Sequence, residues 1–309
     1  MHTQSQITPA SWGMVATLGL IWGATFLFTE LALEGITPFW LAAGRIGFAA
    51  LLAVAIWQLR GGRLFLTKDT AWRALAVSGL FNSAVPFMLL SWGQQTVTSG
   101  FAGVSMASGA LIMLPLAHVF VPGERITPRR TIGMLVGFVG VAVLLGGQAF
   151  ASSGDPMEPY GRLACFGAAG CYAVSSVLVR RLPPIDPFGL AAMALVFGSM
   201  LVIPAALVVE GPPPLPDTRT LWIVALLGLI PTAGANMLRI LVIRSAGPIF
   251  MSLVSYQVPM WSVILGIVVL GEPFKIQLLL AMGLILLGVL ISQWGALNRL
   301  FRRQVTPNS

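Results

Sequence analysis

Long apolar stretches separated by short polar connections run through nearly the whole of this 309-residue chain. A stretch of about 20 apolar residues crosses the hydrocarbon core of a bilayer as an α-helix. The connections are rich in Pro, Gly and charge, and none is long enough to fold as a soluble domain. The pattern predicts an all-α membrane protein with ten transmembrane helices, at approximately residues 12–32, 39–58, 72–93, 100–121, 131–149, 160–179, 188–209, 220–243, 248–270 and 276–297.

The ten predicted helices fall into two similar halves. Pro38-Phe39-Trp40-Leu41-Ala42-Ala43 recurs 149 positions later as Pro187-Phe188-Gly189-Leu190-Ala191-Ala192, and Gly123-Glu124 recurs as Gly271-Glu272. We therefore expect one repeat at residues 1–152 (helices 1–5) and a second at residues 153–309 (helices 6–10). Because five is an odd number, the second repeat must cross the membrane in the opposite orientation. This inverted-topology arrangement is typical of transporters with a substrate site between the repeats.

Composition and charge agree with a membrane protein. The chain is 57% hydrophobic and 9% charged, whereas a soluble domain is roughly 25% charged. Despite the net charge of +8, the charged residues lie mainly in the short connections, so no basic patch indicates a nucleic-acid partner. Thirteen Lys and Arg residues lie in one set of alternate connections and only three in the other set. The positive-inside rule then predicts that both termini are cytoplasmic.

Several short motifs resemble the EamA-type members of the drug/metabolite transporter (DMT) superfamily. They are Trp22-Gly23 in the first helix, Pro38 followed by Arg45 in the second, Gly-Glu after the fourth and ninth helices, and the glycine-spaced fifth and tenth helices (Gly133, Gly137, Gly140; Gly283, Gly288). Within that family the chain is most similar to YddG-type bacterial exporters of aromatic amino acids. The resemblance implies a multi-pass protein of the bacterial inner membrane.

The two repeats also differ at positions where the resemblance would make them match. Pro259 stands thirteen residues before Glu272, but Leu111 occupies the equivalent position of the first repeat. Ala194 occupies the position that matches Arg45. A strictly symmetric mechanism is therefore not expected.

Polar and aromatic residues near the middle of the predicted helices are candidates for the substrate cavity, because polar groups in lipid are costly without partners. Amide and hydroxyl groups suit a zwitterion, and aromatic and Met side chains suit an apolar side chain. The alternative for each polar residue is a bond to its own backbone or to a neighbouring helix. The candidates are Trp22, Thr25, Asn82, Ser105, Met106, Tyr172, Ser175, Asn236, Tyr256, Gln257 and Met260.

Arg45 and the intramembrane prolines have separate interpretations. Arg45 lies about two helical turns from the predicted outer end of its helix, where it could extend outward, pair with Glu30 or Glu34, or bind a substrate carboxylate at the cavity mouth. Pro86 and Pro259 lie near the middle of their helices. Because proline removes a backbone hydrogen bond, they are hinge candidates for alternating access, and static kinks are the alternative.

The sequence also lacks the residues that proton coupling, metal binding or enzymatic catalysis would need. The only carboxylate inside a predicted helix is Glu30, near an outer end, so we expect transport without proton coupling; coupling to sodium held by backbone carbonyls is the alternative. Cys165 and Cys171 lie on one helix at a spacing that suits neither a disulfide nor a metal. Hydrolysis would need an acid pair, an activated nucleophile or metal ligands. We therefore expect no metal, no cofactor and no enzymatic activity.

Together these observations predict an inner-membrane exporter that passes small metabolites, above all aromatic or neutral amino acids, through a central cavity by alternating access. The partners are the small-molecule substrate and membrane lipid. An exporter of other metabolites or drugs with ion coupling is the main alternative, followed by a lipid-handling protein or an intramembrane enzyme. The glycines of the fifth helix favour close helix contact, either inside the bundle or in a homodimer, so the chain is a monomer or a homodimer.

Overall fold

The structure, a computed structural model, describes residues 8–120, 126–146, 155–246 and 248–305. In this part of the chain the regular structure is helical, apart from an isolated antiparallel bridge between Phe65 and Ile185. The helices are α1 (Pro9–Leu33), α2 (Pro38–Leu59), α3 (Trp72–Gly79), η1 (Leu80–Ala84), α4 (Val85–Gly93), α5 (Ser99–Ala107), α6 (Gly109–Phe120), α7 (Pro128–Gly146), α8 (Glu158–Arg180), α9 (Pro187–Glu210), α10 (Thr218–Leu227), η2 (Gly228–Gly234), α11 (Ala235–Ala246), α12 (Pro248–Met251), α13 (Val254–Leu270) and α14 (Ile276–Val305).

These helices form the ten predicted segments. Eight segments are both at least 18 residues long and apolar enough to cross a membrane. The other two contain α7, of 19 residues, and α13, of 17 residues. Four segments combine consecutive helices: α3–η1–α4, α5–α6, α10–η2–α11 and α12–α13. The prediction of an all-α membrane protein with ten helices is confirmed. The predicted boundary between residues 152 and 153 lies outside the described residues.

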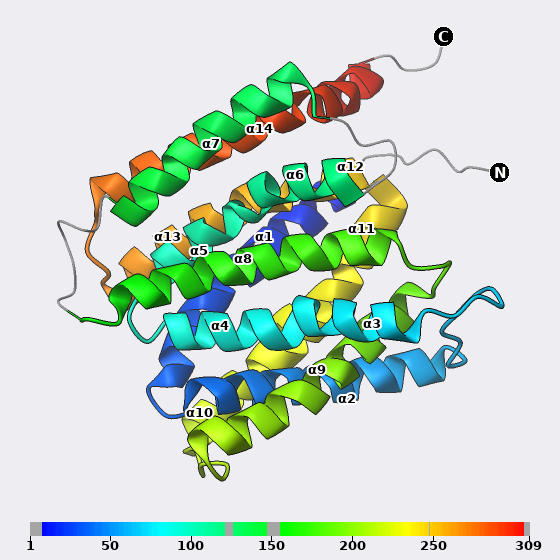
Figure 1. Ribbon diagram of the computed structural model, residues 1–309, viewed down its shortest axis with the longest axis vertical. Helices are drawn as coiled ribbons and strands as arrows, with labels where there is room; N and C mark the ends of the chain where they lie inside the picture. Colours follow the sequence, from blue (N-terminus) through cyan, green and yellow to red (C-terminus); the bar gives the residue numbers. More distant parts are fainter. Residues whose placement is uncertain (1–7, 121–125, 147–154, 247, 306–309) are drawn as a thin grey trace.

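The packing follows the duplication of the sequence. The contact of α1 with α13 has its counterpart in the contact of α8 with α6, and the contact of α2 with η2 has its counterpart in that of α9 with η1. Two pairs of equivalent helices meet each other directly, α2 with α9 and α7 with α14. Figure 1 shows these pairs on opposite sides of the bundle. The two repeats therefore pack as inverted copies around the centre of the molecule.

The glycines of α7 pack inside the molecule against α14. A Cβ atom added to Gly133 would lie 2.5 Å from the carbonyl oxygen of Gly288, and one added to Gly140 would lie 2.8 Å from the backbone nitrogen of Ile285. Small residues permit such close approach of two backbones, which is a common basis of helix packing in membranes. Of the two roles predicted for these glycines, the structure shows the one inside the bundle.

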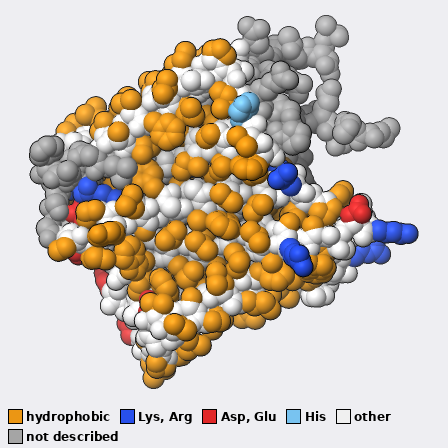
Figure 2. All heavy atoms as spheres, viewed as in Figure 1, with side chains coloured by type: hydrophobic (Ala, Val, Ile, Leu, Met, Phe, Trp, Pro, Cys, Tyr) orange, Lys and Arg blue, Asp and Glu red, His pale blue; other side chains and the backbone are white. Residues whose placement is uncertain are grey.

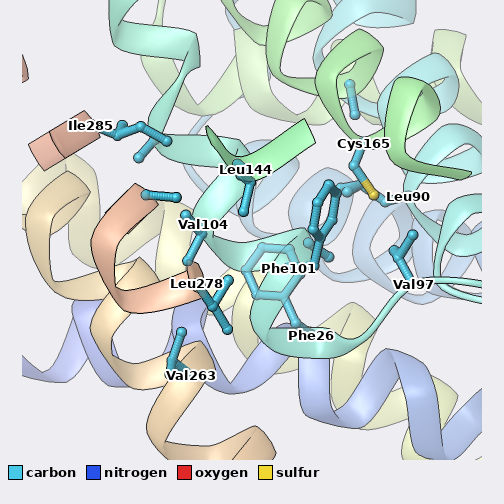
Figure 3. Packing of buried hydrophobic residues seen from close by; sticks show 14 of the residues in the cluster. Phe26, Leu90, Val97, Phe101, Val104, Leu144, Cys165, Val263, Leu278 and Ile285 are labelled. Carbon is cyan, nitrogen blue, oxygen red and sulfur yellow. The ribbon is translucent and has the colours of Figure 1, made fainter. Parts of the chain in front are cut away.

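The largest apolar cluster lies where α1, α4, α5, α8, α13 and α14 converge. Phe101 of α5 is fully buried and is surrounded by Phe26, Leu90 and Cys165 from three other helices. Figure 3 shows these side chains together with Val263 and Leu278 from the second repeat. The cluster therefore joins the two repeats through apolar packing.

The charged residues gather at the two ends of the bundle. Glu34, Glu210 and Glu272 follow or close helices at one end, which we call the acidic end. Arg60, after α2, and most of the Lys and Arg residues of the described loops lie at the opposite end, which we call the basic end. Figure 2 shows Lys and Arg side chains mainly toward one end of an otherwise apolar face. This separation matches the alternation of charge along the sequence.

Candidate substrate-binding site

A π-helical segment interrupts the third helical segment and another interrupts the eighth, at equivalent places in the two repeats. η1 begins at Leu80 and η2 begins at Gly228, 148 positions later. Pro86 lies two residues after the end of η1, and Pro231 lies within η2. Proline has no N–H group to donate, and π-helical turns are frequent at functional sites. Because η1 packs against α9 and η2 against α2, irregular backbone lies at the interface between the repeats.

Arg45 of α2 is buried at this interface. Its side chain is only 8% exposed, and its Nε donates to Oγ1 of Thr232 in η2 at 2.8 Å. The guanidinium carbon lies 3.9 Å from the centre of the Phe87 ring of α4. Thr232 in turn donates to the carbonyl oxygen of Leu227 at 2.8 Å. The hydroxyl therefore accepts from Arg45 while it supports the backbone of η2.

The predicted pairing of Arg45 with Glu30 or Glu34 is wrong. Glu34 pairs with Arg219 of α10 at 3.2 Å, and Glu30 accepts from the backbone N–H of Ser99 at 3.1 Å. Arg45 faces η2 and α4, whereas the two glutamates face α10 and α5. No carboxylate of the described residues is paired with Arg45.

The equivalent contact in the other repeat carries no charge. Ser83 of η1 donates to the carbonyl oxygens of Gly79, at 2.9 Å, and of Ala194, at 3.2 Å. Ala194 is the counterpart of Arg45, so a hydroxyl of the π-helical segment contacts the same place on the partner helix in both repeats. Only one of the two places holds a cation.

Three other predicted residues join Arg45 around η2. Trp22 donates from Nε1 to the carbonyl oxygen of Pro231 at 3.0 Å, and Asn236 donates from Nδ2 to that of Thr232. Tyr172 of α8 packs against two apolar clusters and lies within electrostatic range of Arg45. The structure therefore brings a cation, two aromatic side chains and an amide to one region.

A small pocket opens beside this region. Thr232 lines it, and its walls come from α2, α9, η2 and α11. There is room for about one water molecule, so the structure represents a closed arrangement around the site. The lining residues are Ala53, Phe188, Ala191, Leu195, Thr232, Ala233, Asn236, Met237 and Ile240.

Other predicted cavity residues have local roles or lie elsewhere. Thr25 and Ser105 donate to carbonyl oxygens of their own helices, and Ser175 donates to the carbonyl oxygen of Ser78 in α3 at 3.1 Å. These are the backbone and interhelical bonds that the sequence left as alternatives. Met106 packs on the largest apolar cluster. Asn82 is half-buried within η1.

The candidates on α13 differ among themselves. The hydroxyl of Tyr256 is buried and has no hydrogen-bond partner among the described residues. Gln257 packs against Gly19 of α1, where an added Cβ would lie 2.6 Å from its Oε1. Met260 is 47% exposed, so it does not belong to an enclosed wall. Pro259 is buried within α13.

Sequence reasoning missed several residues of the region. Thr232 and Phe87 contact Arg45 directly, and Phe188, Leu195 and Met237 line the pocket. For Thr232 a signal was present, because its hydroxyl directly follows an intramembrane proline. For Phe87 and the apolar pocket residues the sequence held no signal that separates them from lipid-facing positions.

Acidic residues of the second repeat cap helices of the first repeat at the acidic end. Glu272 accepts from the N–H and the hydroxyl of Ser99, at 2.7 and 2.5 Å, and from the N–H of Gly100 at 3.2 Å. Glu210 accepts from the N–H groups of Phe39 and Trp40, at 2.9 and 3.1 Å. Carboxylates favour helix N-termini because they satisfy free N–H groups and the helix dipole. The acidic end is therefore held closed between the repeats.

The loops of the two repeats also meet at the basic end. The N–H of Leu66 donates to the carbonyl oxygen of Pro184, and that of Asp186 donates to the carbonyl oxygen of Leu64, both at 2.9 Å. The two bonds flank the Phe65–Ile185 bridge. The region around Arg45 thus lies between two ends that are both joined across the repeats.

The repeats correspond to a known family unit. The model of the family described as "EamA-like transporter family" matches residues 11–146 and again residues 159–294. The chain belongs to the EamA-like transporter family. The two matches cover the helices of each repeat and leave out the connection between them. This EamA-like protein is therefore a multi-pass membrane transporter of a small-molecule substrate and not an enzyme.

Relatives of this EamA-like transporter include proteins with and without named substrates. The uncharacterized inner membrane transporter YedA of Escherichia coli K12 is 26% identical over 92% of this chain and 90% of its own length. A probable terminal-alkyne amino-acid exporter of Streptantibioticus cattleyicolor is 30% identical over 47% of this chain and 48% of its own. The aromatic amino acid exporter YddG of Ancylobacter novellus is 37% identical, but over only 23% of this chain and 24% of its own. The similarity to YddG is thus partial.

Proposed function

We propose that this EamA-like transporter exports small metabolites, chiefly aromatic or neutral amino acids, across a bacterial inner membrane by alternating access. The observation that carries the proposal is the meeting of Arg45, Tyr172, Trp22 and Asn236 at the interface of inverted repeats. A cation, an amide and aromatic rings are the groups that bind the charged and apolar parts of such a molecule. The two partially similar amino-acid exporters support the same substrate class.

The proposed orientation of the protein in the membrane follows from the distribution of its charged residues. The basic end carries the excess of Lys and Arg and is assigned to the cytoplasm, together with both termini. The acidic end then faces outward. YedA, which is similar along nearly the full chain, is described as an inner membrane transporter and supports the same location.

The proposed motion is a rocking of the repeats about their irregular helices. Pro86 adjoins η1 and Pro231 lies within η2, so both equivalent segments contain backbone with fewer helical hydrogen bonds. Pro86 is therefore a hinge candidate, and Pro231 lies close to the corresponding place in the other repeat. Pro259 remains a second candidate within α13.

We propose that transport is not coupled to protons, because the carboxylates on the described membrane-crossing helices lie near helix ends. One observation favours the alternative. Glu30 and Glu272 both accept from the N–H of Ser99, at 3.1 and 2.7 Å, so two carboxyl groups meet at the acidic end. Such a pair can share a proton, since like charges at close range disfavour double ionisation. A coupled exporter would use this pair.

Uptake into liposomes tests the proposal. The purified protein is reconstituted and supplied with labelled tryptophan, phenylalanine, threonine or lactate, with and without a pH gradient. Uptake of the aromatic amino acids that equilibrates without accumulation, and that the gradient leaves unchanged, is the expected result. Accumulation driven by the gradient would favour the coupled alternative. Transport of lactate alone, or of none of the four compounds, would contradict the proposed substrate class.

A further inference from the structure

We infer that Arg45 binds the carboxylate of the transported molecule and that the pocket beside Thr232 receives the apolar part of the same molecule. This inference rests on the proposed function and narrows it. The substrate is defined by an anionic carboxylate at one end and an apolar group at the other. The ammonium group of the substrate contributes little to binding.

The first argument is the charge of Arg45. A guanidinium is permanently charged and presents five N–H donors, and burial of such a group is costly unless an anion compensates it. Within the described chain the hydrogen bonding of Arg45 is limited to the hydroxyl of Thr232, and the face of its guanidinium lies on the Phe87 ring. A hydroxyl and a ring face compensate the charge only in part. A carboxylate completes the site, since it accepts two parallel bonds from a guanidinium.

The second argument is that the carboxylates considered as partners of Arg45 contact other groups. Glu34 is paired with Arg219, and Glu30 and Glu272 accept from Ser99 at the acidic end. The groups that face Arg45 from the neighbouring elements are the phenol of Tyr172 and the hydroxyl of Thr232, both of which are uncharged. The compensating anion therefore comes from the ligand.

The third argument is the position of the pocket. Ala53 lies eight residues after Arg45 on the same buried face of α2, which places it about 12 Å further along the helix. Thr232 contacts Arg45 and also lines the pocket. The other walls include Phe188, Leu195 and Met237, which suit an apolar or aromatic group. Because Thr232 adjoins both, a molecule whose carboxylate binds Arg45 can place its apolar group in the pocket once the pocket widens.

The fourth argument is the difference between the repeats. Ala194 occupies the counterpart of Arg45, so the guanidinium at this position of the first repeat has no equivalent in the second repeat. A carboxylate therefore binds on one side only, which fixes a single orientation of the substrate between α2 and η2.

The test measures binding and transport with three related compounds. These are phenylalanine, 3-phenylpropionate, which keeps the carboxylate but lacks the ammonium group, and phenylalaninamide, which keeps the ammonium group but lacks the carboxylate. Binding is read from the rise in melting temperature of the purified protein, and transport from competition with labelled phenylalanine in liposomes. We expect phenylalanine and 3-phenylpropionate to bind and compete, and we expect phenylalaninamide to require at least a tenfold higher concentration.

Variants of Arg45 test whether this residue binds the carboxylate. R45Q removes the charge and is expected to abolish the melting-temperature rise with 3-phenylpropionate, whereas R45K keeps the charge without the planar fork and gives an intermediate result. R219Q is the matched control, because it removes an exposed Arg that pairs with Glu34. The melting temperature without ligand shows whether each variant is folded. The comparison of the three compounds on the unmodified protein needs no variant at all.

The outcomes separate the inference from the proposed function. If phenylalanine is transported but phenylalaninamide competes as well as 3-phenylpropionate, the inference fails and the exporter proposal stands. Retention of the 3-phenylpropionate response in folded R45Q also overturns the inference. If phenylalanine is not transported, the proposed substrate fails. A melting-temperature response to 3-phenylpropionate that depends on Arg45 would still support the carboxylate site.

Discussion

Replacement of Gly288 by alanine tests whether the close contact of α7 and α14 stabilises the bundle. The added Cβ would lie 2.5 Å from the carbonyl oxygen of Gly133 and 2.5 Å from the backbone nitrogen of Gly137. Ordinary contact begins at 3.4 Å, so the helices must separate by about 0.9 Å. Overpacking of this kind costs about 1–3 kcal/mol. Because the obstructing atoms are backbone, rotation of a side chain cannot relieve the contact.

The matched control is Gly283→Ala on the same helix, where an added Cβ meets nothing within 4 Å. Alanine in place of glycine within a helix stabilises by roughly 0.5–1 kcal/mol. Both variants gain this contribution, so the difference between them isolates the packing cost of about 1–3 kcal/mol.

The assay is reversible unfolding of the purified protein by titration with a denaturing detergent, followed by circular dichroism. We expect Gly288→Ala to unfold at the lower detergent fraction and Gly283→Ala to unfold at or above that of the unmodified protein. Transport by the folded variants should be similar, because within the described residues α7 and α14 pack mainly against each other. Equal stability of the two variants would refute the packing described here.

The remaining predictions concern the acidic end of the bundle and the π-helical segment η2. Glu272→Ala should lower the free energy of unfolding by about 1–3 kcal/mol, because the hydroxyl of Ser99 and the N–H of Gly100 lose their acceptor, whereas Glu34→Ala removes an exposed ion pair worth about 0–1 kcal/mol. Equal effects of Glu272→Ala and Glu34→Ala on the melting temperature would contradict the role of Glu272 as a helix cap. Pro231→Ala should slow phenylalanine counterflow by favouring regular α-helix in η2, while Pro204→Ala, on an exposed part of α9, should not. Equal rates in both variants would exclude η2 as a moving part.

Much of the fold could be predicted because the bilayer imposes a length on each apolar stretch. The ten segments and the duplication follow from local sequence and from an offset that links Pro38 to Pro187. The separation of charge between the two ends follows equally from the linear order of the residues. Each of these features depends on position along the chain and not on contacts between distant side chains.

The site was less predictable because it depends on contacts between the repeats. Arg45 was recognised as unusual, but its partners Thr232 and Phe87 come from other helices, and its apparent partners Glu30 and Glu34 only lay near it in the sequence pattern. The π-helical geometry of η1 and η2 involves a shift of backbone bonds that composition does not encode. For Asn236 and Trp22 the sequence indicated a polar role and could not name the carbonyl oxygen that each one contacts.

The unequal ends of the bundle affect the energetics of transport. Two identical inverted repeats would exchange conformations on passing from the inward-open to the outward-open state, and the two states would have equal free energy. In this chain carboxylate caps join the repeats at one end, and backbone bonds between loops join them at the other. The two openings therefore break different bonds. A difference of about 1.4 kcal/mol between the free energies of the two open states would populate one of them about tenfold over the other. The duplication therefore permits both states, and the divergence of the repeats determines which of them is favoured at rest.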